Sequence, residues 1–348
     1  MIGSIAEAEM LSRRHGIPTE EILLMGLNLC GVNYLVGFNG MKRGRFAMKP
    51  SGMDRSFFFA MTINPDSPFT HDGRNIFLGD AIIGSASEVI TDTCTDTYHR
   101  NNRRHVTVNS NIRGSCRGCK FCGTYEMASE ESSLLSLDAM RASARQMIAH
   151  CGRVPESIGL VTACFPSEDE LVDHLLMLRK VYRELGFVGE IQYIGSQLTS
   201  SESLDVLSSD GRFSLYFSVE IFDRRNILMR PEKARVTLDV GRAVIGEAKA
   251  RGIDTSMLYI LGLDPLETLE EEFPKYASIL TRHPLVQLMQ NYSPKHEFLK
   301  DEEAHSLDYY LRARKFMEGL FDPMGLYPRG WDNYRAPWFG WYGNKRLP

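Results

Sequence analysis

From about residue 105 to residue 290, short apolar runs alternate with longer amphipathic stretches. The apolar runs predict six β-strands, at residues 106–109, 158–162, 190–194, 215–221, 255–261 and 286–290. The stretches between them predict helices at residues 137–150, 167–185, 201–207, 231–250 and 267–281. Ser167 is a suitable N-cap for its helix, and Pro231 is suited to a first helical turn. This alternation predicts an α/β fold built from six strand–helix units.

Composition and charge argue against a nucleic-acid-binding, membrane or secreted protein. The 348 residues include 40 basic and 44 acidic side chains, a net charge of −4, which gives no global electrostatic reason to bind nucleic acid. No stretch reaches the roughly 18 consecutive apolar residues of a membrane helix, and no basic segment followed by an apolar run marks a secretory signal. We therefore expect a cytoplasmic protein without a membrane partner.

Three of the seven cysteines lie within one short segment. Cys116, Cys119 and Cys122 form a C-x2-C-x2-C pattern, and soft thiolates in such a cluster select zinc or an iron–sulfur centre. A structural zinc site takes four protein ligands, and only His105 could complete one here, in space. A bacterial ferredoxin would continue with a fourth cysteine, where this chain has Glu126. The spacing therefore favours three protein ligands and one open coordination position.

Residues 105–124, HVTVNSNIRGSCRGCKFCGT, resemble the first strand and cluster loop of radical S-adenosylmethionine (radical SAM) enzymes. Phe121 before the third cysteine and Gly123 after it belong to that pattern, although the commonest family spacing is C-x3-C-x2-C. The resemblance implies a [4Fe-4S] cluster on the three cysteines, with S-adenosylmethionine (SAM) on the fourth iron. It also implies a partial (β/α)6 TIM-like barrel, which agrees with the six predicted units.

The resemblance to a biotin-synthase-like core extends to further residues. Glu220 resembles the fourth-strand acid that helps bind the amino acid part of SAM. Arg230 and Arg235 are the candidates to hold the SAM carboxylate, and Arg235 is the better placed relative to Gly252. A structural ion pair for Glu220 and solvated positions for the two arginines remain open. Residues 258–264, LYILGLD, resemble the fifth-strand glycine motif near the adenine, which implies a cofactor contact at Leu261 and Gly262.

The second strand departs from the family pattern. The family places Gly-Gly-Glu after this strand, whereas residues 161–167 read VTACFPS. Thr162 or a backbone carbonyl would have to replace the missing groups. Cys164 at this place is a candidate donor of a hydrogen atom to a product radical, with an ordinary buried cysteine as the alternative.

The segments outside residues 101–298 predict two additions to the barrel. Residues 1–100 predict an α+β extension, with helices at 5–15 and 19–27, a loop at 35–53, and strands at 57–62 and 76–83. Residues 299–348 predict a helix at 302–320 and an aromatic tail that holds all three tryptophans. This tail would pack across the open edge of the barrel or, alternatively, form a lid over its mouth.

The predicted function is a radical SAM enzyme that acts on a small, biosynthetic substrate and receives electrons from reduced flavodoxin or ferredoxin. The arginines near the cysteines suit such an anionic donor or substrate, or simply a solvated loop. The alternatives are a radical SAM enzyme that modifies a peptide or protein, a zinc-binding interaction module, and an electron-transfer iron–sulfur protein. The sequence does not determine the reaction subtype, because one fold serves many chemistries.

Overall fold

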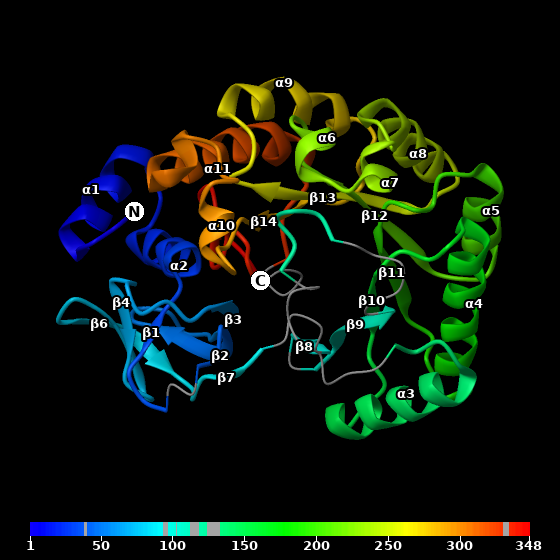
Figure 1. Cartoon of the computed structure of the whole chain (residues 1–348), viewed down its shortest axis with the longest axis horizontal. Helices are drawn as coiled ribbons and strands as arrows, with labels where there is room; N and C mark the ends of the chain where they lie inside the picture. The colour runs from blue at the N-terminus through cyan, green and yellow to red at the C-terminus, as the bar shows by residue number, and fades with distance from the viewer. Residues whose placement is uncertain (38–39, 93–96, 102, 112–117, 124–132, 330–333) are drawn as a thin grey trace.

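The computed structural model describes residues 1–37, 40–92, 97–101, 103–111, 118–123, 133–329 and 334–348. An extension at the N-terminus lies beside a curled sheet that is covered by helices on its outer side (Figure 1). In this described part of the chain, no helix combines the length and the apolar character needed to cross a bilayer.

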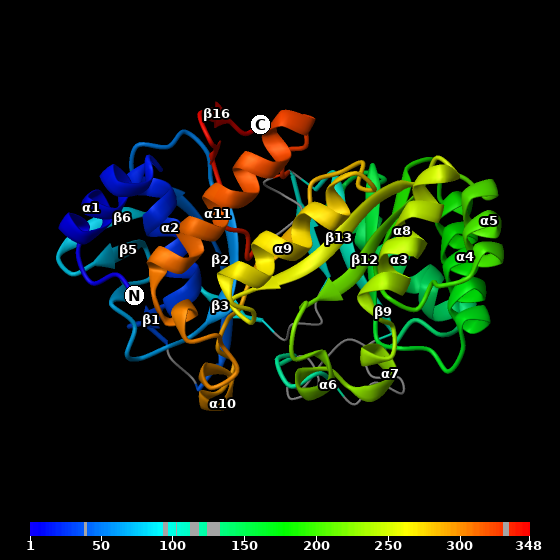
Figure 2. The same cartoon turned by 90° about the horizontal axis from the view of Figure 1, so that it is seen from above.

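The curled sheet contains six parallel strands that pair in chain order. They are β9 (His105–Asn111), β10 (Ser157–Thr162), β11 (Glu190–Gly195), β12 (Phe213–Glu220), β13 (Asp254–Leu261) and β14 (Leu285–Leu288). One short strand, β8 (Tyr98–Arg100), pairs antiparallel with β9 at the edge. The sheet forms a half-barrel, which confirms the prediction of a partial (β/α)6 barrel (Figures 1 and 2).

Helices follow these strands and cover the outer face of the half-barrel (Figure 2). They are α3 (Leu137–Cys151), α4 (Glu168–Glu184), α5 (Ser201–Ser209), α6 (Arg225–Leu228), α7 (Pro231–Ala234), α8 (Leu238–Ala250) and α9 (Leu266–Ala277). The prediction of one helix at residues 231–250 is wrong. The helix ends at Ala234, and the Thr237 side chain accepts a bond from the Val240 N–H to start α8. An internal threonine therefore acts as an N-cap.

The N-terminal extension is an α+β unit, as predicted. Helices α1 (Ile5–His15) and α2 (Thr19–Cys30) pack beside a seven-stranded sheet. Its strands are β1 (Asn33–Tyr34), β2 (Arg43–Pro50), β3 (Phe57–Thr62), β4 (Phe69–His71), β5 (Asn75–Leu78), β6 (Ala81–Ala86) and β7 (Ile90–Thr91). They pair in the order β1-β4-β5-β6-β2-β3, with β7 also on β2.

Two predictions in this extension are wrong in detail. The predicted loop at residues 35–53 contains β2, in which Phe46 and Met48 are buried while Ala47 and Lys49 face solvent. Lys49 lies on the solvent side of this half-buried strand, whereas Arg43 at its start is buried. The predicted strand at residues 76–83 is instead a hairpin, because the chain turns at Gly79, which has a φ of 58°. Glycine adopts this left-handed conformation without steric cost.

The C-terminal segment contains α10 (Pro294–Glu297), α11 (Leu307–Phe321), β15 (Trp341–Tyr342) and β16 (Lys345–Arg346), with single turns of 3-10 helix at Glu303–His305 and Asp322–Met324. After α11 the tail returns to the half-barrel, where the Leu288 N–H of β14 donates to the Arg335 carbonyl at 2.8 Å. Trp338, Phe339 and Tyr342 are buried. The prediction that this tail packs across the open edge of the barrel is confirmed.

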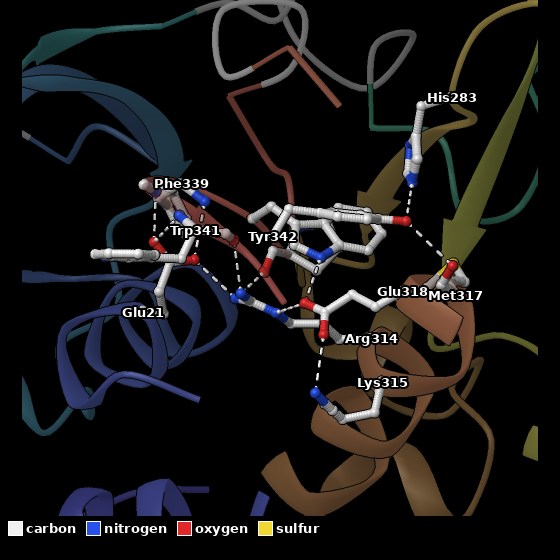
Figure 3. Close-up of polar contacts among 12 residues, drawn as sticks. Glu21, His283, Arg314, Lys315, Met317, Glu318, Phe339, Trp341 and Tyr342 are labelled. Atoms are coloured by element: carbon white, nitrogen blue, oxygen red, sulfur yellow. Dashed lines mark hydrogen bonds and ion pairs between the residues drawn. The ribbon is translucent and has the colours of Figure 1, made fainter. Parts of the chain in front are cut away.

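A buried polar cluster anchors this tail to two helices (Figure 3). The carboxylate of Glu21 on α2 accepts from the Phe339, Gly340 and Trp341 backbone N–H groups. Arg314 on α11 donates to Glu21 at 2.7 Å and to Glu318 at 2.8 Å. We call Glu21, Arg314 and Glu318 the anchor cluster. Because it joins α2, α11 and the tail, it fixes where the tail meets the barrel.

Candidate functional site

A cavity of about 410 Å³ opens at the C-terminal ends of the barrel strands. Its walls include Thr162 from β10, Glu220 from β12 and Ile260 from β13, together with the cysteine loop that follows β9. The volume lies within the range of sites for small molecules and cofactors. In β/α barrels this face carries the active groups, because the loops after the strands converge there.

Most of the candidate residues line this one cavity. They are Cys119, Phe121, Cys122, Gly123, Thr162, Cys164, Glu220 and Arg230. Cys116 lies outside the described residues. Arg235 does not line the cavity and is exposed at the end of α7. Leu261 and Gly262 are buried below it, and Gly262 packs against the Tyr310 hydroxyl.

The two described thiols of the triad lie in a tight turn. The Cys122 N–H donates to the Cys119 carbonyl at 2.9 Å, and the Lys120 N–H donates to the Leu228 carbonyl at 2.8 Å. Burial raises the pKa of Cys119 to about 12, and the nearby Glu220 charge acts in the same direction. A thiolate is the form that binds a metal, so a cationic centre beside Cys119 would offset this cost. Within the described residues, no three His, Cys, Asp or Glu side chains group as metal ligands, but Cys116 falls outside that set.

Glu220 lies at a bulge where β12 ends. The register between β12 and β13 shifts between Ser218 and Glu220, and Glu220 has a φ of 65°. One carboxylate oxygen, Oε1, contacts Lys233 Nζ at 2.6 Å, while the buried Oε2 has no hydrogen-bond partner in the described part of the chain. Burial acts to lower the pKa of Lys233, but Glu220 and Cys119 outweigh it and the pKa is raised. The unused oxygen is suited to a donor from a ligand, since buried acceptors are normally bonded.

Arg230 and Cys164 both line the cavity and contact each other. The Arg230 guanidinium donates to the Cys164 sulfur, and Arg230 also bonds to Cys119 through its backbone N–H. The loop that carries Cys164 is held by Gln197, whose side chain bonds to both the N–H and the carbonyl of Phe165 at 2.9 Å. Through these contacts, Arg230 at the start of α7 links the cysteine loop to the loop after β10 beside the cavity.

A further part of the cavity lining was missed by the sequence analysis. It consists of Tyr98, Tyr292 and Tyr334 with Arg100 and Arg335, and we call it the tyrosine wall. The Tyr98 and Tyr334 rings stack with centroids 4.8 Å apart. A Cβ atom at Gly123 would lie 2.7 Å from the Tyr292 ring, so glycine is required for this close approach. The aromatic tail was a usable signal for Tyr334, but the sequence did not show which wall it would join.

A second missed residue, Arg43 of β2, supports the tyrosine wall from behind. Its guanidinium is buried, pairs with Asp92 and donates to Gln290 Oε1 at 3.0 Å. It lies 5.0 Å from the centroid of the Tyr292 ring and 5.5 Å from that of Tyr334. The N-terminal extension therefore contributes to the shape of the cavity, because cation–π contacts fix both rings.

Among known proteins, the chain shows similarity only in comparison with solved structures. No protein-family model matches the chain, and no curated protein matches its sequence. SuiB from Streptococcus suis, bound to S-adenosylmethionine, superposes with a TM-score of 0.45 and 13% identity over 64% of this chain and 48% of its own. Methylornithine synthase (PylB) gives a TM-score of 0.47 and 14% identity over 61% of each chain.

Another such structure is coproporphyrinogen III oxidase (HemN) from Escherichia coli, described as a radical SAM enzyme. It gives a TM-score of 0.43 and 16% identity, over 63% of this chain and 54% of that chain. The present chain thus spans about half the length of SuiB and of HemN.

Proposed function

We propose that this protein is a radical SAM enzyme that acts on a small, biosynthetic substrate. One observation carries the proposal: two thiols of the triad, an unused oxygen of Glu220 and the Arg230 guanidinium border a single cavity at the mouth of a half-barrel. These groups suit an iron–sulfur cluster and an amino acid ligand side by side. Soft thiolates select iron–sulfur clusters, and a carboxylate and a guanidinium complement an amino acid's charged ends.

The residues fit the two cofactors in the following way. Cys116, Cys119 and Cys122 would hold the [4Fe-4S] cluster, with Phe121 and Gly123 shaping its loop. Glu220 would accept from the amino group of SAM, and Arg230, which lines the cavity, is better placed than Arg235 for its carboxylate. Thr162 would contribute at the end of β10, and Leu261 and Gly262 would support the adenine side. When bound, this pair of cofactors supplies one-electron cleavage of SAM and a 5′-deoxyadenosyl radical that abstracts hydrogen.

The remaining walls would protect that chemistry from water. Ile194, Leu258, Ile260 and Leu285 line the cavity with apolar surface. Cys164 stays a candidate hydrogen donor, and its sulfur accepts from the Arg230 guanidinium. In Cys164→Ala, unchanged turnover and unchanged product stereochemistry would contradict the donor role.

The test of the proposed function is anaerobic reconstitution of the full chain. We expect about four iron and four sulfide per chain, and 5′-deoxyadenosine after reduction with SAM present. Cys122→Ala should lose the iron, whereas Cys151→Ala, a buried cysteine at the end of α3, should keep it. A colourless protein with about one zinc per chain would favour an interaction module. A cluster without SAM cleavage would favour an electron-transfer protein.

The proposal also covers the electron donor, the cellular location and the domain bounds. We propose reduced flavodoxin or ferredoxin as the electron donor and the cytoplasm as the location. The five described cysteines are free thiols, as is usual in a reducing compartment. We also propose that residues 1–100, 101–298 and 299–348 are the extension, barrel and tail, although β8, which ends at Arg100, pairs with the barrel sheet.

A further inference from the structure

Glu220 is at the centre of a backbone turn that side chains rarely adopt. The Ile221 N–H donates to the Val219 carbonyl at 2.9 Å, so the turn spans three residues. The φ of Glu220, 65°, lies in the left-handed region, and a γ-turn with a positive φ is the rare, strained form. Strain of this kind persists only where the surrounding structure enforces it, and it is concentrated at functional sites. The groups that bond to this turn are therefore of functional interest.

Arg225, in the first turn of α6, bonds to the turn through its carbonyl groups. Its Nη1 donates to the carbonyls of Val219 and Ile221, both at 2.7 Å. Its Nη2 donates at 2.8 Å to the carbonyl of Val236, which lies between α7 and α8. One guanidinium thus bonds to the residues on both sides of Glu220. The planar fork of arginine suits such a set of bonds better than the single ammonium group of lysine.

Asp264, between β13 and α9, bonds to the residues that follow the turn. Its carboxylate accepts from the Phe222 N–H at 2.8 Å and from the Asp223 N–H at 3.0 Å. The Tyr259 hydroxyl donates to the same carboxylate at 2.7 Å and so fixes its orientation. Asp264 is fully buried, so bulk water does not compete for these bonds.

These two side chains hold one short segment through different backbone groups, and we call Arg225 and Asp264 the turn clamp. Glu220 lines the cavity, whereas neither member of the clamp does. The Glu220 side chain is held separately, because its Oε1 contacts Lys233 Nζ at 2.6 Å. The backbone and the side chain of Glu220 are therefore both constrained by other groups of the folded chain.

We propose that Arg225 and Asp264 are positioning residues, which hold Glu220 in its left-handed conformation so that its carboxylate is preorganised to bind a ligand in the cavity. A binding group that is already ordered saves the free energy of ordering it when the ligand binds. That this ligand is SAM rests on the proposed function, whereas the hold on the turn does not. A purely structural role for the clamp would weaken the fold without acting through Glu220.

The experiment measures SAM dissociation constants by isothermal titration calorimetry on the anaerobically reconstituted full chain. Arg225→Lys and Asp264→Asn should each weaken binding by about 10-fold, because each removes bonds that hold the turn. In a Glu220→Ala background, the same two changes should alter the dissociation constant by less than about 2-fold, since no carboxylate remains to be positioned. This double-mutant cycle detects action through Glu220, which a general loss of stability would not imitate.

Two matched controls carry the same substitutions away from the turn. Arg242 on α8 pairs with Glu272 at 3.2 Å, and Asp254 at the start of β13 pairs with Arg282 at 2.6 Å. Arg242→Lys and Asp254→Asn should keep the wild-type affinity for SAM. Thermal unfolding of each variant checks that it is folded, and having two clamp variants protects the test against the failure of one.

Hydrogen exchange, followed by mass spectrometry on the full chain without SAM, reports on the turn itself. A peptide that contains residues 219–223 should exchange about 10-fold faster in both clamp variants, because the turn opens more often when its bonds are lost. The two controls should keep the wild-type exchange rate in this peptide.

The outcomes separate this inference from the proposed function. Unchanged exchange of residues 219–223 in both clamp variants overturns the positioning role even if the protein cleaves SAM. A wild-type SAM affinity in both variants, or an equal loss of affinity with and without the Glu220 carboxylate, also overturns it. If the wild type binds no SAM, the proposed function fails, and faster exchange confined to the clamp variants still supports the positioning of Glu220.

Discussion

Two buried carboxylates, Glu21 and Glu220, differ in how completely the chain satisfies them. In the anchor cluster, both oxygens of Glu21 are used, by Arg314 and by three backbone N–H groups (Figure 3). At the cavity, only one oxygen of Glu220 is used, by Lys233, and the other has no hydrogen-bond partner among the described residues. Both glutamates pair with a cation, so the ion pair itself does not distinguish them.

The two glutamates differ in the number of carboxylate oxygens that lack a hydrogen-bond partner among the described residues. A buried polar atom without a partner costs free energy, so natural proteins retain one mainly where a ligand or a water completes it. Glu21 has no remaining capacity, which fits a residue that holds elements together. Glu220 has one remaining acceptor, and the residue lines the cavity. For Glu21 and Glu220, the number of unused acceptor positions therefore separates a structural ion pair from a candidate binding group.

The largest effect should come from Glu21→Ala. This change leaves the Arg314 guanidinium, which is 1% exposed, with only one of its two counter-charges and leaves three backbone N–H donors without an acceptor. We expect a loss of about 3–5 kcal/mol in the free energy of unfolding, measured with urea. Glu9→Ala on the exposed face of α1 is the control and should change stability by less than about 0.5 kcal/mol. A small loss in Glu21→Ala would contradict the structural role.

Glu220→Gln should affect binding more than folding. We expect SAM to bind about 10–100-fold more weakly to the reconstituted protein, because an amide is a poorer acceptor for an ammonium group. The free energy of unfolding should fall by less than about 1 kcal/mol, since water in the cavity can solvate Lys233.

Glu232→Gln, on the exposed face of α7, is the matched control for Glu220→Gln. It should bind SAM with the wild-type affinity, measured by the same titration. If Glu220→Gln destabilised the fold as strongly as Glu21→Ala and left SAM binding intact, the contrast between the two glutamates would be lost.

Acid should lower the free energy of unfolding through His283. This residue lies beside the anchor cluster, with its Nε2 3.2 Å from the Tyr342 hydroxyl. Burial lowers the pKa of His283 from 6.5 to about 3. As the pH falls below 6.5, the unfolded chain gains a proton that the folded chain does not, so stability is lost. From about pH 7 to pH 5 this loss should reach about 2 kcal/mol, and His283→Gln should not show it. Parallel pH profiles of stability for the two proteins would refute this.

The smallest effect should come from Lys315→Met. Lys315 contacts Glu318 at 3.2 Å from the solvent side of the anchor cluster and is 42% exposed. Exposed ion pairs contribute little, so we expect a change of less than about 0.5 kcal/mol in urea unfolding. A loss close to that of Glu21→Ala would show that the cluster depends on its outer charge as well.

The sequence predicted the elements that depend on local pattern. All six barrel strands were located, because each is a short apolar run between amphipathic helices. The errors arose at two places. Thr237 caps a new helix inside a pattern that looks like one continuous helix. In β2, glycine and basic residues made a half-buried strand resemble a loop. Periodicity alone does not distinguish these cases.

The residues of the candidate site also fall into two groups, those predicted from the sequence and those that were missed. Cys119 was proposed from a local motif and Glu220 and Arg230 from the family resemblance, and all three line the cavity. Tyr334 and Arg43 were missed, because their positions depend on contacts between distant parts of the chain. The Asn28 side chain donates to the Tyr334 carbonyl 306 positions away, and Arg43 bonds to Gln290 across 247 positions. No window of sequence contains such information.

The contribution of the tail to the tyrosine wall also has a consequence for biosynthesis. A ribosome makes the chain from the N-terminus, so the cysteine loop emerges long before Tyr334 and Arg335 do. The lining of the cavity is therefore incomplete until the last residues have been made and the Leu288 N–H can bond to the Arg335 carbonyl.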